Sequence, residues 1–255
     1  GASISDFDNK EGLYEWASSV PDGFESTFET EIIRKDGEKR SVEINAKLYE
    51  ESGKKYVLSV ARDISMKKRY VEDILATVTN FLEIHDNYTK GHSEKVAALA
   101  KETARAMGLP SEKVNETYLT GLVHDIGKML IPENILNKPG ELSKEEYGKI
   151  KKHPEWAYEA IIKNEALSEI AKNAKHHHER WDGKGYPDGL KGNEIPMVSQ
   201  ILTVADSYDA MTSERAYRSA MTKNEAVAEL KACKGTQFPP HVVDVFIEKV
   251  LKLNF

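Results

Sequence analysis

Disulfide bonds and membrane spans are both missing from the 255-residue sequence. Its single cysteine, Cys233, excludes an internal disulfide and is typical of a reducing compartment. No apolar run approaches the roughly 20 residues of a transmembrane helix, and no signal peptide is recognisable. The sequence therefore predicts a cytoplasmic segment without membrane contact. A membrane or sensor segment upstream of Gly1 in a longer protein is not excluded.

An excess of positive charge is missing as well. The chain has 36 Lys and Arg against 42 Asp and Glu, which gives a net charge of −6. This balance argues against a protein that binds a nucleic-acid polymer or carries a polybasic membrane anchor. A small anionic ligand is still compatible with it, because a local pocket can be positive on an acidic protein.

Strand patterns are confined to the start of the chain. The segments FESTFETEIIR, KRSVEINAKLYE and KKYVLSVARDI are rich in β-branched and aromatic residues with partial alternation. Turn signals at Asp36-Gly37 and Ser52-Gly53 separate them, so residues 1–64 are predicted to hold a three-stranded antiparallel meander. Three strands alone form a marginal unit, and we expect them to pack on upstream chain or on a second copy.

Helical patterns begin at Ser65 and continue to the end. In residues 65–86, apolar side chains recur at alternating steps of four and three, at Val71, Leu75, Val78 and Leu82. Such a seam is typical of an amphipathic helix packed on its own domain or of a parallel dimer helix that links a sensor to an effector. The later segments predict a mainly α fold.

Histidine and aspartate gather at predicted helix ends. The pair His124-Asp125 closes one helix, and Asp206 sits within an otherwise apolar helix, where an unpaired carboxylate costs several kcal/mol. Neutral imidazoles and carboxylates aimed at one point are the ligands of divalent transition metals. A carboxylate can bridge two such ions, and two ions about 3.5–4 Å apart can clamp a phosphoryl group. The other candidates are His92, His153 and two of His176, His177 and His178, which spacing does not distinguish.

These motifs resemble a known family. HDIGK followed by HHERWDGKGYPDGL is similar to the HD-GYP domain, a branch of the HD superfamily of metal-dependent phosphohydrolases, and the similarity runs from about Tyr70 to Phe255. The resemblance implies an all-α helical bundle and hydrolysis of cyclic di-GMP to pGpG, in some members on to GMP. The expected organisation is a sensor fragment at 1–64, a linker helix at 65–86 and the HD-GYP domain at 87–255.

The resemblance also implies a set of ligands. The first metal would be held by His92, His124, Asp125 and Asp206, and the second by His153, His177, His178 and the bridging Asp125. Iron or manganese is expected. Some members carry a glutamate that binds a third metal, and Tyr88 stands at that position, so we expect two ions.

The resemblance assigns substrate contacts as well. Asp125 and Lys128 are expected to be catalytic, with Lys128 on the phosphodiester, and Arg215 and Arg218 match positions that contact guanine or phosphate. Tyr186, in the Gly185-Tyr186-Pro187 loop, would border the pocket. The same loop is a candidate contact for diguanylate cyclase domains.

The first sixty-odd residues resemble the last three strands of a PAS sensor domain and end on Arg62-Asp63-Ile64. The front of that fold is not recognisable, so no cofactor is expected there. A homodimer is predicted. Two alternatives to a cyclic di-GMP phosphodiesterase stay open: a cyclic di-GMP binding module with little turnover, and an HD hydrolase for another cyclic dinucleotide. His85 and His241 are expected to have no site role.

Overall fold

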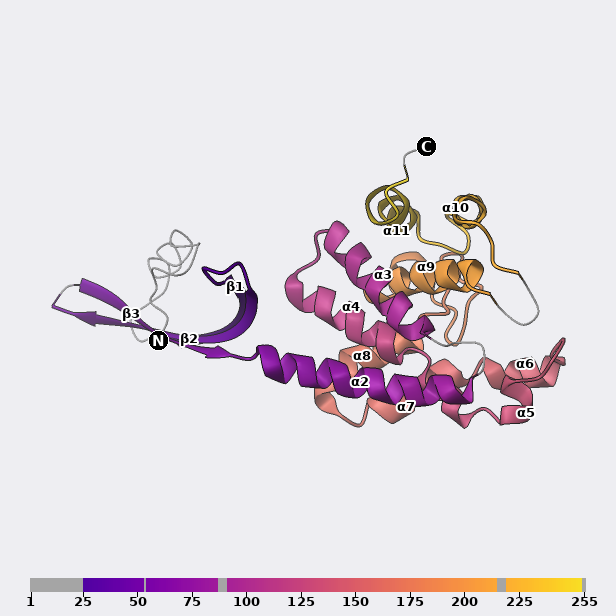
Figure 1. Ribbon diagram of the computed structural model, residues 1–255, viewed down its shortest axis with the longest axis horizontal. Helices are drawn as coiled ribbons and strands as arrows, with labels where there is room; N and C mark the ends of the chain where they lie inside the picture. The colour runs from indigo at the N-terminus through magenta and orange to yellow at the C-terminus, as the bar shows by residue number, and fades with distance from the viewer. Residues whose placement is uncertain (1–24, 53, 87–90, 215–218, 254–255) are drawn as a thin grey trace. The chain divides into compact units, whose positions relative to one another are not determined.

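A computed structural model describes residues 25–52, 54–86, 91–214 and 219–253 (Figure 1). The chain divides into two compact units, Gly1–Asp73 and Ile74–Phe255, and each is described by itself. The division falls inside a single long helix, α2 (Ser65–His85).

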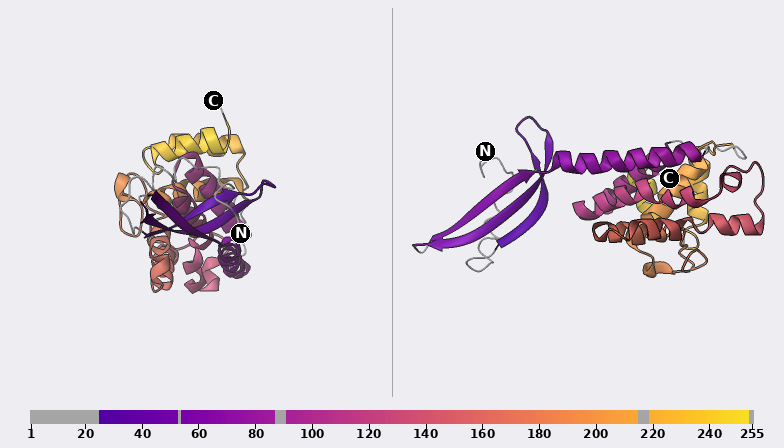
Figure 2. Two further views of the ribbon diagram at one scale, coloured as in Figure 1. Left: turned by 90° about the vertical axis from the view of Figure 1, so that its left-hand side faces the viewer. Right: turned by 90° about the horizontal axis from the view of Figure 1, so that it is seen from below.

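The first unit contains the predicted antiparallel meander. Its strands are β1 (Glu25–Ile33), β2 (Lys39–Glu51) and β3 (Lys54–Asp63), paired in the order β1-β2-β3 (Figure 2). Gly37 makes the first turn with a φ of +84°, a conformation that glycine adopts without strain. Along β2, every second residue from Val42 to Leu48 is buried, as expected for a strand with one covered face.

The second unit is helical, which confirms the predicted mainly α fold. None of its described helices is long and apolar enough to cross a membrane. After α2 the elements are α3 (His92–Ala106), α4 (Ser111–Val123), η2 (Ile126–Leu130), α5 (Glu133–Leu136), α6 (Lys144–Ile150), α7 (His153–Ile161), η3 (Glu165–Leu167), α8 (Ser168–Lys175), η4 (Gly192–Glu194), α9 (Met197–Thr212), α10 (Lys223–Ala232), α11 (Pro240–Val245) and η5 (Phe246–Val250).

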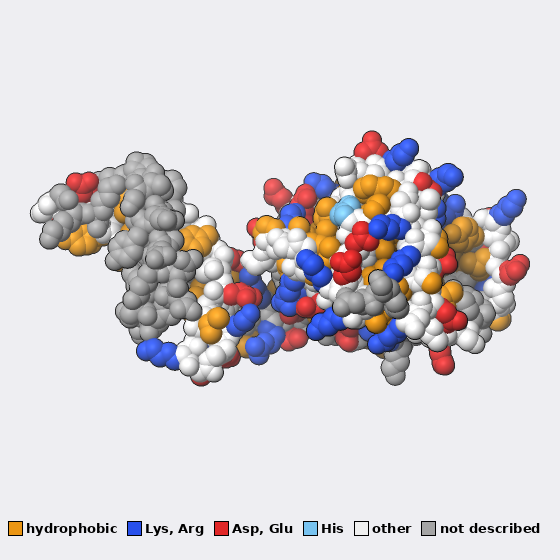
Figure 3. All heavy atoms as spheres, turned by 90° about the horizontal axis from the view of Figure 1, so that it is seen from above, with side chains coloured by type: hydrophobic (Ala, Val, Ile, Leu, Met, Phe, Trp, Pro, Cys, Tyr) orange, Lys and Arg blue, Asp and Glu red, His pale blue; other side chains and the backbone are white. Residues whose placement is uncertain are grey.

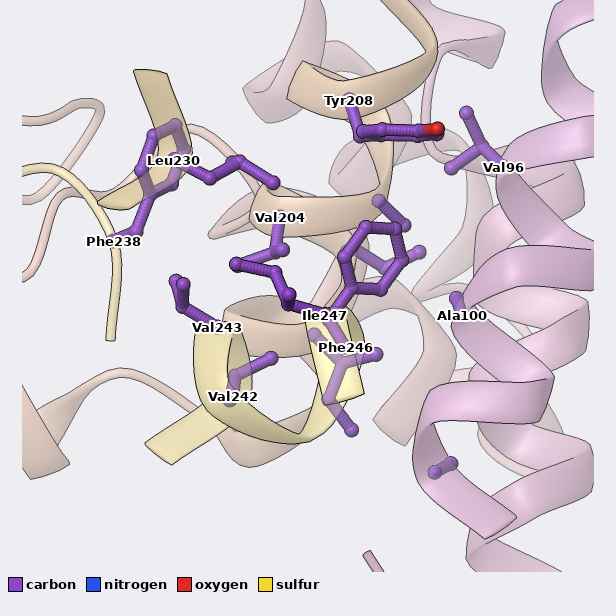
Figure 4. Close-up of a cluster of buried hydrophobic side chains, with 14 of the residues drawn as sticks. Val96, Ala100, Val204, Tyr208, Leu230, Phe238, Val242, Val243, Phe246 and Ile247 are labelled. Carbon is purple, nitrogen blue, oxygen red and sulfur yellow. The ribbon is translucent and has the colours of Figure 1, made fainter. Parts of the chain in front are cut away.

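Helix α9 forms the centre of the larger hydrophobic core. Its side chains from Val198 to Ala205 are buried, and the apolar ones among them pack against residues of α3, α10, α11 and η5. In Figure 4, Val204 and Tyr208 of α9 face Phe246 and Ile247, and Tyr208 meets Phe246 edge to face at 5.2 Å. Each large apolar side chain buried in this way contributes roughly 1.5–3 kcal/mol. A rigid core therefore surrounds the helix that carries Asp206.

The C-terminal part of α2 packs on the helical unit. It does so through residues of the seam that was considered as a dimer interface. Leu82 is only 3% exposed, and Leu75 packs against a cluster that includes Leu122 and Ile170. The Thr79 hydroxyl donates to the Leu122 carbonyl on the same side. Leu82 is thus buried in its own domain and Leu75 is partly buried against it. This agrees with the alternative of an amphipathic helix packed on its own domain, and the alternative that these two residues face a partner helix is wrong.

The surface of the helical unit carries charges of both signs. On the face shown in Figure 3, Lys and Arg side chains are interspersed with Asp and Glu. This distribution agrees with the net charge and provides no basic stripe for a nucleic-acid polymer on that face.

Candidate metal centre

Two groups of potential ligands meet at one aspartate. The ligand atoms of Asp125, His153, His177 and His178 lie within 4.8 Å of one another, and so do those of His92, His124 and Asp125. The members come from the ends of α3, α4, α7 and α8, and all but His178 are buried. Segments far apart in the sequence therefore converge on Asp125.

The two carboxylate oxygens of Asp125 face different groups. Oδ1 lies 3.2 Å from His153 Nε2 and 4.0 Å from His177 Nε2. Oδ2 lies 3.4 Å from His124 Nε2 and 4.0 Å from His92 Nε2. A carboxylate placed in this way can bind one cation through each oxygen.

Three of the imidazoles are oriented by backbone carbonyls. Nδ1 of His124, His153 and His177 lies 2.8, 2.8 and 2.6 Å from the carbonyl oxygens of Gly121, Ile150 and Ala174, respectively. Because a carbonyl only accepts, each Nδ1 carries a hydrogen, and the Nδ1–H bond directs Nε2 of the same ring toward the cluster.

His124 Nε2 provides the clearest indication that these residues fit a metal ion. It is buried and has no hydrogen-bond partner among the described residues. A buried nitrogen without a partner is costly, whereas the same lone pair is well placed for a metal ion. The donor set of imidazoles around a shared carboxylate thus fits a divalent transition metal.

His92 is held between two carboxylates of α9. Its Nε2 lies 3.2 Å from Asp206 Oδ1, and its Nδ1 lies 2.7 Å from Asp209 Oδ2. Asp206 and Asp209 are three residues apart and therefore share one helix face. The sequence reasoning included Asp206 but missed Asp209, although the Asp-x-x-Asp spacing could have indicated it.

Burial and charge set the protonation of the cluster. Burial and the neighbouring His153 lower the pKa of His178 to about 3, and burial with the neighbouring His178 lowers that of His177 well below its usual range. Burial also lowers the pKa of His92, but its hydrogen bonds to Asp206 and Asp209 outweigh this and raise it to about 9. The site therefore offers neutral imidazoles on one side and an imidazolium among carboxylates on the other.

Both aspartates are ionised in this setting. Burial raises the pKa of Asp125, but the Lys128 ammonium and His124 outweigh it and hold the pKa well below its ordinary value. At Asp206, burial is likewise outweighed by the hydrogen bond from His92, so the pKa is lowered. Two ionised carboxylates beside the imidazoles are anionic ligands suited to a cation.

Close backbone packing brings Asp125 to His153. A Cβ at Gly127 would collide with the His153 carbonyl oxygen, and one at Gly121 would lie 2.6 Å from the Cα of Ala97. Glycine at these positions lets η2 lie against the start of α7 and lets α4 lie against α3.

The histidine run is resolved by a partner outside the cluster. His176 Nε2 lies 2.9 Å from Asp188 Oδ2, which directs this ring away from the centre. His177 and His178 are the two that face Asp125. Spacing alone left this choice open.

The loop after the histidines is anchored by Glu179, which is buried. Its Oε1 accepts hydrogen bonds from the backbone N–H groups of Asp188 and Gly189 at 2.8 and 3.0 Å. The Tyr186 ring lies over His178 with centroids 4.9 Å apart, so the loop borders the cluster. Burial, with a smaller effect of Tyr147, raises the pKa of Tyr186, which keeps its hydroxyl protonated.

Lys128 places a positive charge beside Asp125, the carboxylate shared by the two groups of ligands. Its Nζ lies 2.7 Å from Asp125 Oδ2 and 3.6 Å from Asp86 Oδ2. Burial lowers its pKa, but Asp125 and Asp86 outweigh this and raise it, so the ammonium is charged.

Four residues named from the sequence are not placed by the structure. Tyr88, Arg215 and Arg218 lie outside the described residues, and so does the side chain of His85. His241 is apart from the cluster, with its ring edge to face against Trp181 at 5.7 Å.

Comparisons with known proteins identify the family. The family model described as "HD domain" matches residues 76–242. The chain is 36% identical over 203 residues to RpfG of Xanthomonas campestris pv. campestris, a cyclic di-GMP phosphodiesterase response regulator, with 77% of this chain and 54% of the relative covered. It is 40% identical over 164 residues to 3'3'-cGAMP-specific phosphodiesterase 1 of Vibrio cholerae, with 63% of this chain and 38% of that protein covered.

A solved structure supports the same fold. Bd1817 of Bdellovibrio bacteriovorus, an HDG"Y"P protein, aligns with a TM-score of 0.56 at 21% identity, covering 73% of this chain and 64% of that one. The chain spans about half or less of the length of the two curated relatives.

Proposed function

The chain belongs to the HD-domain family, and on that premise we propose that it is a metal-dependent phosphodiesterase of cyclic dinucleotides, with cyclic di-GMP as the substrate. The observation that carries the proposal is Asp125, whose two oxygens face two separate groups of imidazoles. A phosphodiester needs charge neutralisation on its oxygens and an activated water, and a two-cation site supplies both.

Two cations, iron or manganese, are the proposed cofactors. The first would be held by His92, His124, Asp125 and Asp206, and the second by His153, His177, His178 and Asp125. When bound, they would polarise a phosphoryl oxygen and lower the pKa of a water molecule.

The remaining roles fall to side chains around this centre. The Lys128 ammonium offsets negative charge on the phosphodiester, because it is charged and lies beside Asp125. Tyr186 provides an aromatic wall next to His178, suited to a flat base. Arg215 and Arg218 are proposed to bind guanine or phosphate from the resemblance alone, and the loop at Tyr186 is proposed to contact diguanylate cyclase domains.

A different cyclic dinucleotide is the alternative substrate. One relative is named a 3'3'-cGAMP-specific phosphodiesterase, and the described residues contain no contact that separates guanine from adenine. A binding module with little turnover is less consistent with the site, because binding alone does not require a carboxylate shared by two imidazole groups.

Turnover assays decide between these candidates. Purified chain, loaded anaerobically with Fe²⁺ or with Mn²⁺, is given cyclic di-GMP and 3'3'-cGAMP in parallel, and linear products are quantified. We expect cyclic di-GMP to be hydrolysed with the higher kcat/KM. A higher kcat/KM for 3'3'-cGAMP would show that cGAMP is the preferred substrate. Tight binding of either nucleotide without product would favour the binding module.

The proposed organisation has a PAS-like fragment at 1–64, a linker helix at 65–86 and the catalytic domain at 87–255, assembled as a homodimer. The exposed side of α2 supports the dimer. Ile74, Phe81 and Ile84 are 63%, 63% and 73% exposed, and Tyr70 precedes them by one turn on the same helix. Their spacing fits a heptad repeat. We call these four residues the α2 stripe.

A second copy is the proposed occupant of the α2 stripe. In a parallel pair of identical helices, each heptad position meets itself, so a stripe on one copy is covered by the same stripe on the other. Aromatic and branched side chains at these positions bury most area per residue in such a pair.

A further inference from the structure

The inner face of α2 reaches the metal centre through Glu83. This side chain is only 8% exposed, and it lies on the helix face opposite the α2 stripe. Its Oε1 accepts a hydrogen bond from the Ser93 backbone N–H at 3.1 Å, and its Oε2 accepts one from the Gly91 N–H. Glu83 therefore holds the residues on both sides of His92.

Helix α3 needs this carboxylate because it lacks a cap of its own. The first N–H groups of a helix have no partner within the helix, and a Ser, Thr, Asp or Asn before it normally provides one. The residue in that place is Gly91, with a φ of +71° and no side chain. A carboxylate near the N-terminus also interacts favourably with the helix dipole. Glu83, although it lies on α2, therefore accepts hydrogen bonds from the start of α3 in the way that a capping side chain normally would.

Two carboxylates from different helices then fix His92. Asp209 of α9 holds its ring through Nδ1 at 2.7 Å, and Glu83 of α2 holds the backbone N–H groups of the two residues that flank it, Gly91 and Ser93. The ring can be oriented correctly and still be displaced, because Asp209 holds only the ring, whereas Glu83 holds the backbone at the start of α3. Three residues after Glu83, Asp86 lies 3.6 Å from the Lys128 Nζ, so the end of α2 touches the centre at a second point.

We propose that Glu83 is a positioning residue for His92, through which the placement of α2 sets the cation affinity of the group formed by His92, His124 and Asp125. The proposal rests on the metal site proposed above. It makes the linker helix part of the site: any partner or upstream domain that shifts α2 changes this group more than the group formed by His153, His177 and His178, which Glu83 does not contact.

Cobalt titration tests the proposal without relying on turnover. The chain is stripped with a chelator and titrated with Co²⁺, whose visible absorption reports each bound ion and its coordination. For Glu83→Ala we expect one ion to bind as in the unaltered chain and the other to bind about 10- to 100-fold more weakly, the range found when a group supporting a ligand is lost. Glu83→Gln, which keeps one oxygen acceptor and is the milder change, should give an intermediate loss.

Leu82→Ala is the matched control. Leu82 is the neighbouring buried residue of α2, and its side chain has no hydrogen-bonding group. This variant should lower the melting temperature and leave both cobalt affinities within about twofold.

Equal cobalt affinities in the Glu83 variants and the unaltered chain would overturn the proposal. It would also fail if Leu82→Ala weakened cobalt binding as much as Glu83→Gln, since Glu83 would then act only through stability. Failure of the unaltered chain to bind cobalt would refute the proposed metal site itself, which keeps the two failures distinct.

Discussion

Lys128 lies beside the centre without being a metal ligand. Its side chain is 17% exposed, enough to reach a bound substrate, and its Nζ lies 2.7 Å from Asp125 Oδ2. The nearby positive charge competes with a cation for Asp125, yet it assists any substrate phosphate. Metal content and turnover should therefore respond in different ways to its removal.

Lys128→Ala should keep both metal ions and lose turnover on the order of 10²-fold, the usual cost of one lost contact to developing charge. Metal analysis and kcat measured on the same preparation check this. Lys138→Ala is the control, because Lys138 pairs with Glu146 away from the centre and its loss should change neither quantity. Unchanged turnover in Lys128→Ala would remove the residue from the mechanism.

His92 predicts how metal binding depends on pH. In the metal-free chain its pKa is raised to about 9, so the ring is protonated at pH 7 and a cation must displace that proton. The affinity for the metal ion that His92 binds should therefore rise about tenfold per pH unit between pH 7 and 8, and level off above 9. His177 and His178 add no slope there, because their pKa values are lowered and both rings are already neutral.

Calorimetry with Mn²⁺ in two buffers of different ionisation enthalpy measures the proton released. Asp209→Asn serves as the comparison. It removes one of the two carboxylates that raise the His92 pKa, so the slope between pH 7 and 8 should become shallower. A slope near zero in the unaltered chain would contradict the assignment of His92.

Helix α2 has two apolar faces with different partners. Leu75 and Leu82 pack on the helical unit, while the α2 stripe is exposed. Sequence periodicity indicated an amphipathic helix. As a dimer interface, however, it pointed to the face with Leu75 and Leu82, whereas the exposed apolar face is the α2 stripe. The choice could not be made from α2 alone, because it depends on where Leu122 and Ile170 lie in the folded domain.

Phe81→Asp should convert the proposed dimer into a monomer, because it places a charge in the middle of the α2 stripe. Light scattering at micromolar concentration measures the change. Asn80→Asp adds the same charge at the neighbouring exposed position outside the stripe and should leave the dimer intact. A monomeric unaltered chain, or a dimer that survives Phe81→Asp, would refute the stripe as an interface.

Structures that depend on a few consecutive residues follow directly from the sequence. The structure has capping boxes of Ser143 with Glu146 and of Thr222 with Glu225, and each is a signal that needs only four consecutive residues. The β meander also follows from its alternation and turns. Contacts between distant segments were missed. The spacing of Asp206 and Asp209 places both on one face of α9, but that Asp209 contacts His92, and that Glu83 contacts Ser93, depends on how separate helices pack.

Across the chain, the motifs predicted the ligand types and the structure brought them together. Family resemblance grouped His92, His124 and Asp125, and these now meet within 4.8 Å. Spacing did not distinguish the three consecutive histidines, whereas the resemblance assigned His177 and His178, and in the structure His176 instead contacts Asp188. The PAS-like character of residues 1–64 stays a prediction, since three paired strands are common to many folds.

The shared carboxylate of Asp125 is the centre of the proposed function. The most direct measurement is metal content together with turnover of cyclic di-GMP, for the unaltered chain and Asp125→Ala, both purified anaerobically. We predict two ions per unaltered chain, and loss of metal and of turnover together in the variant, because each proposed cation has Asp125 as a ligand. Three ions or none in the unaltered chain, or both ions retained by Asp125→Ala, would contradict this account.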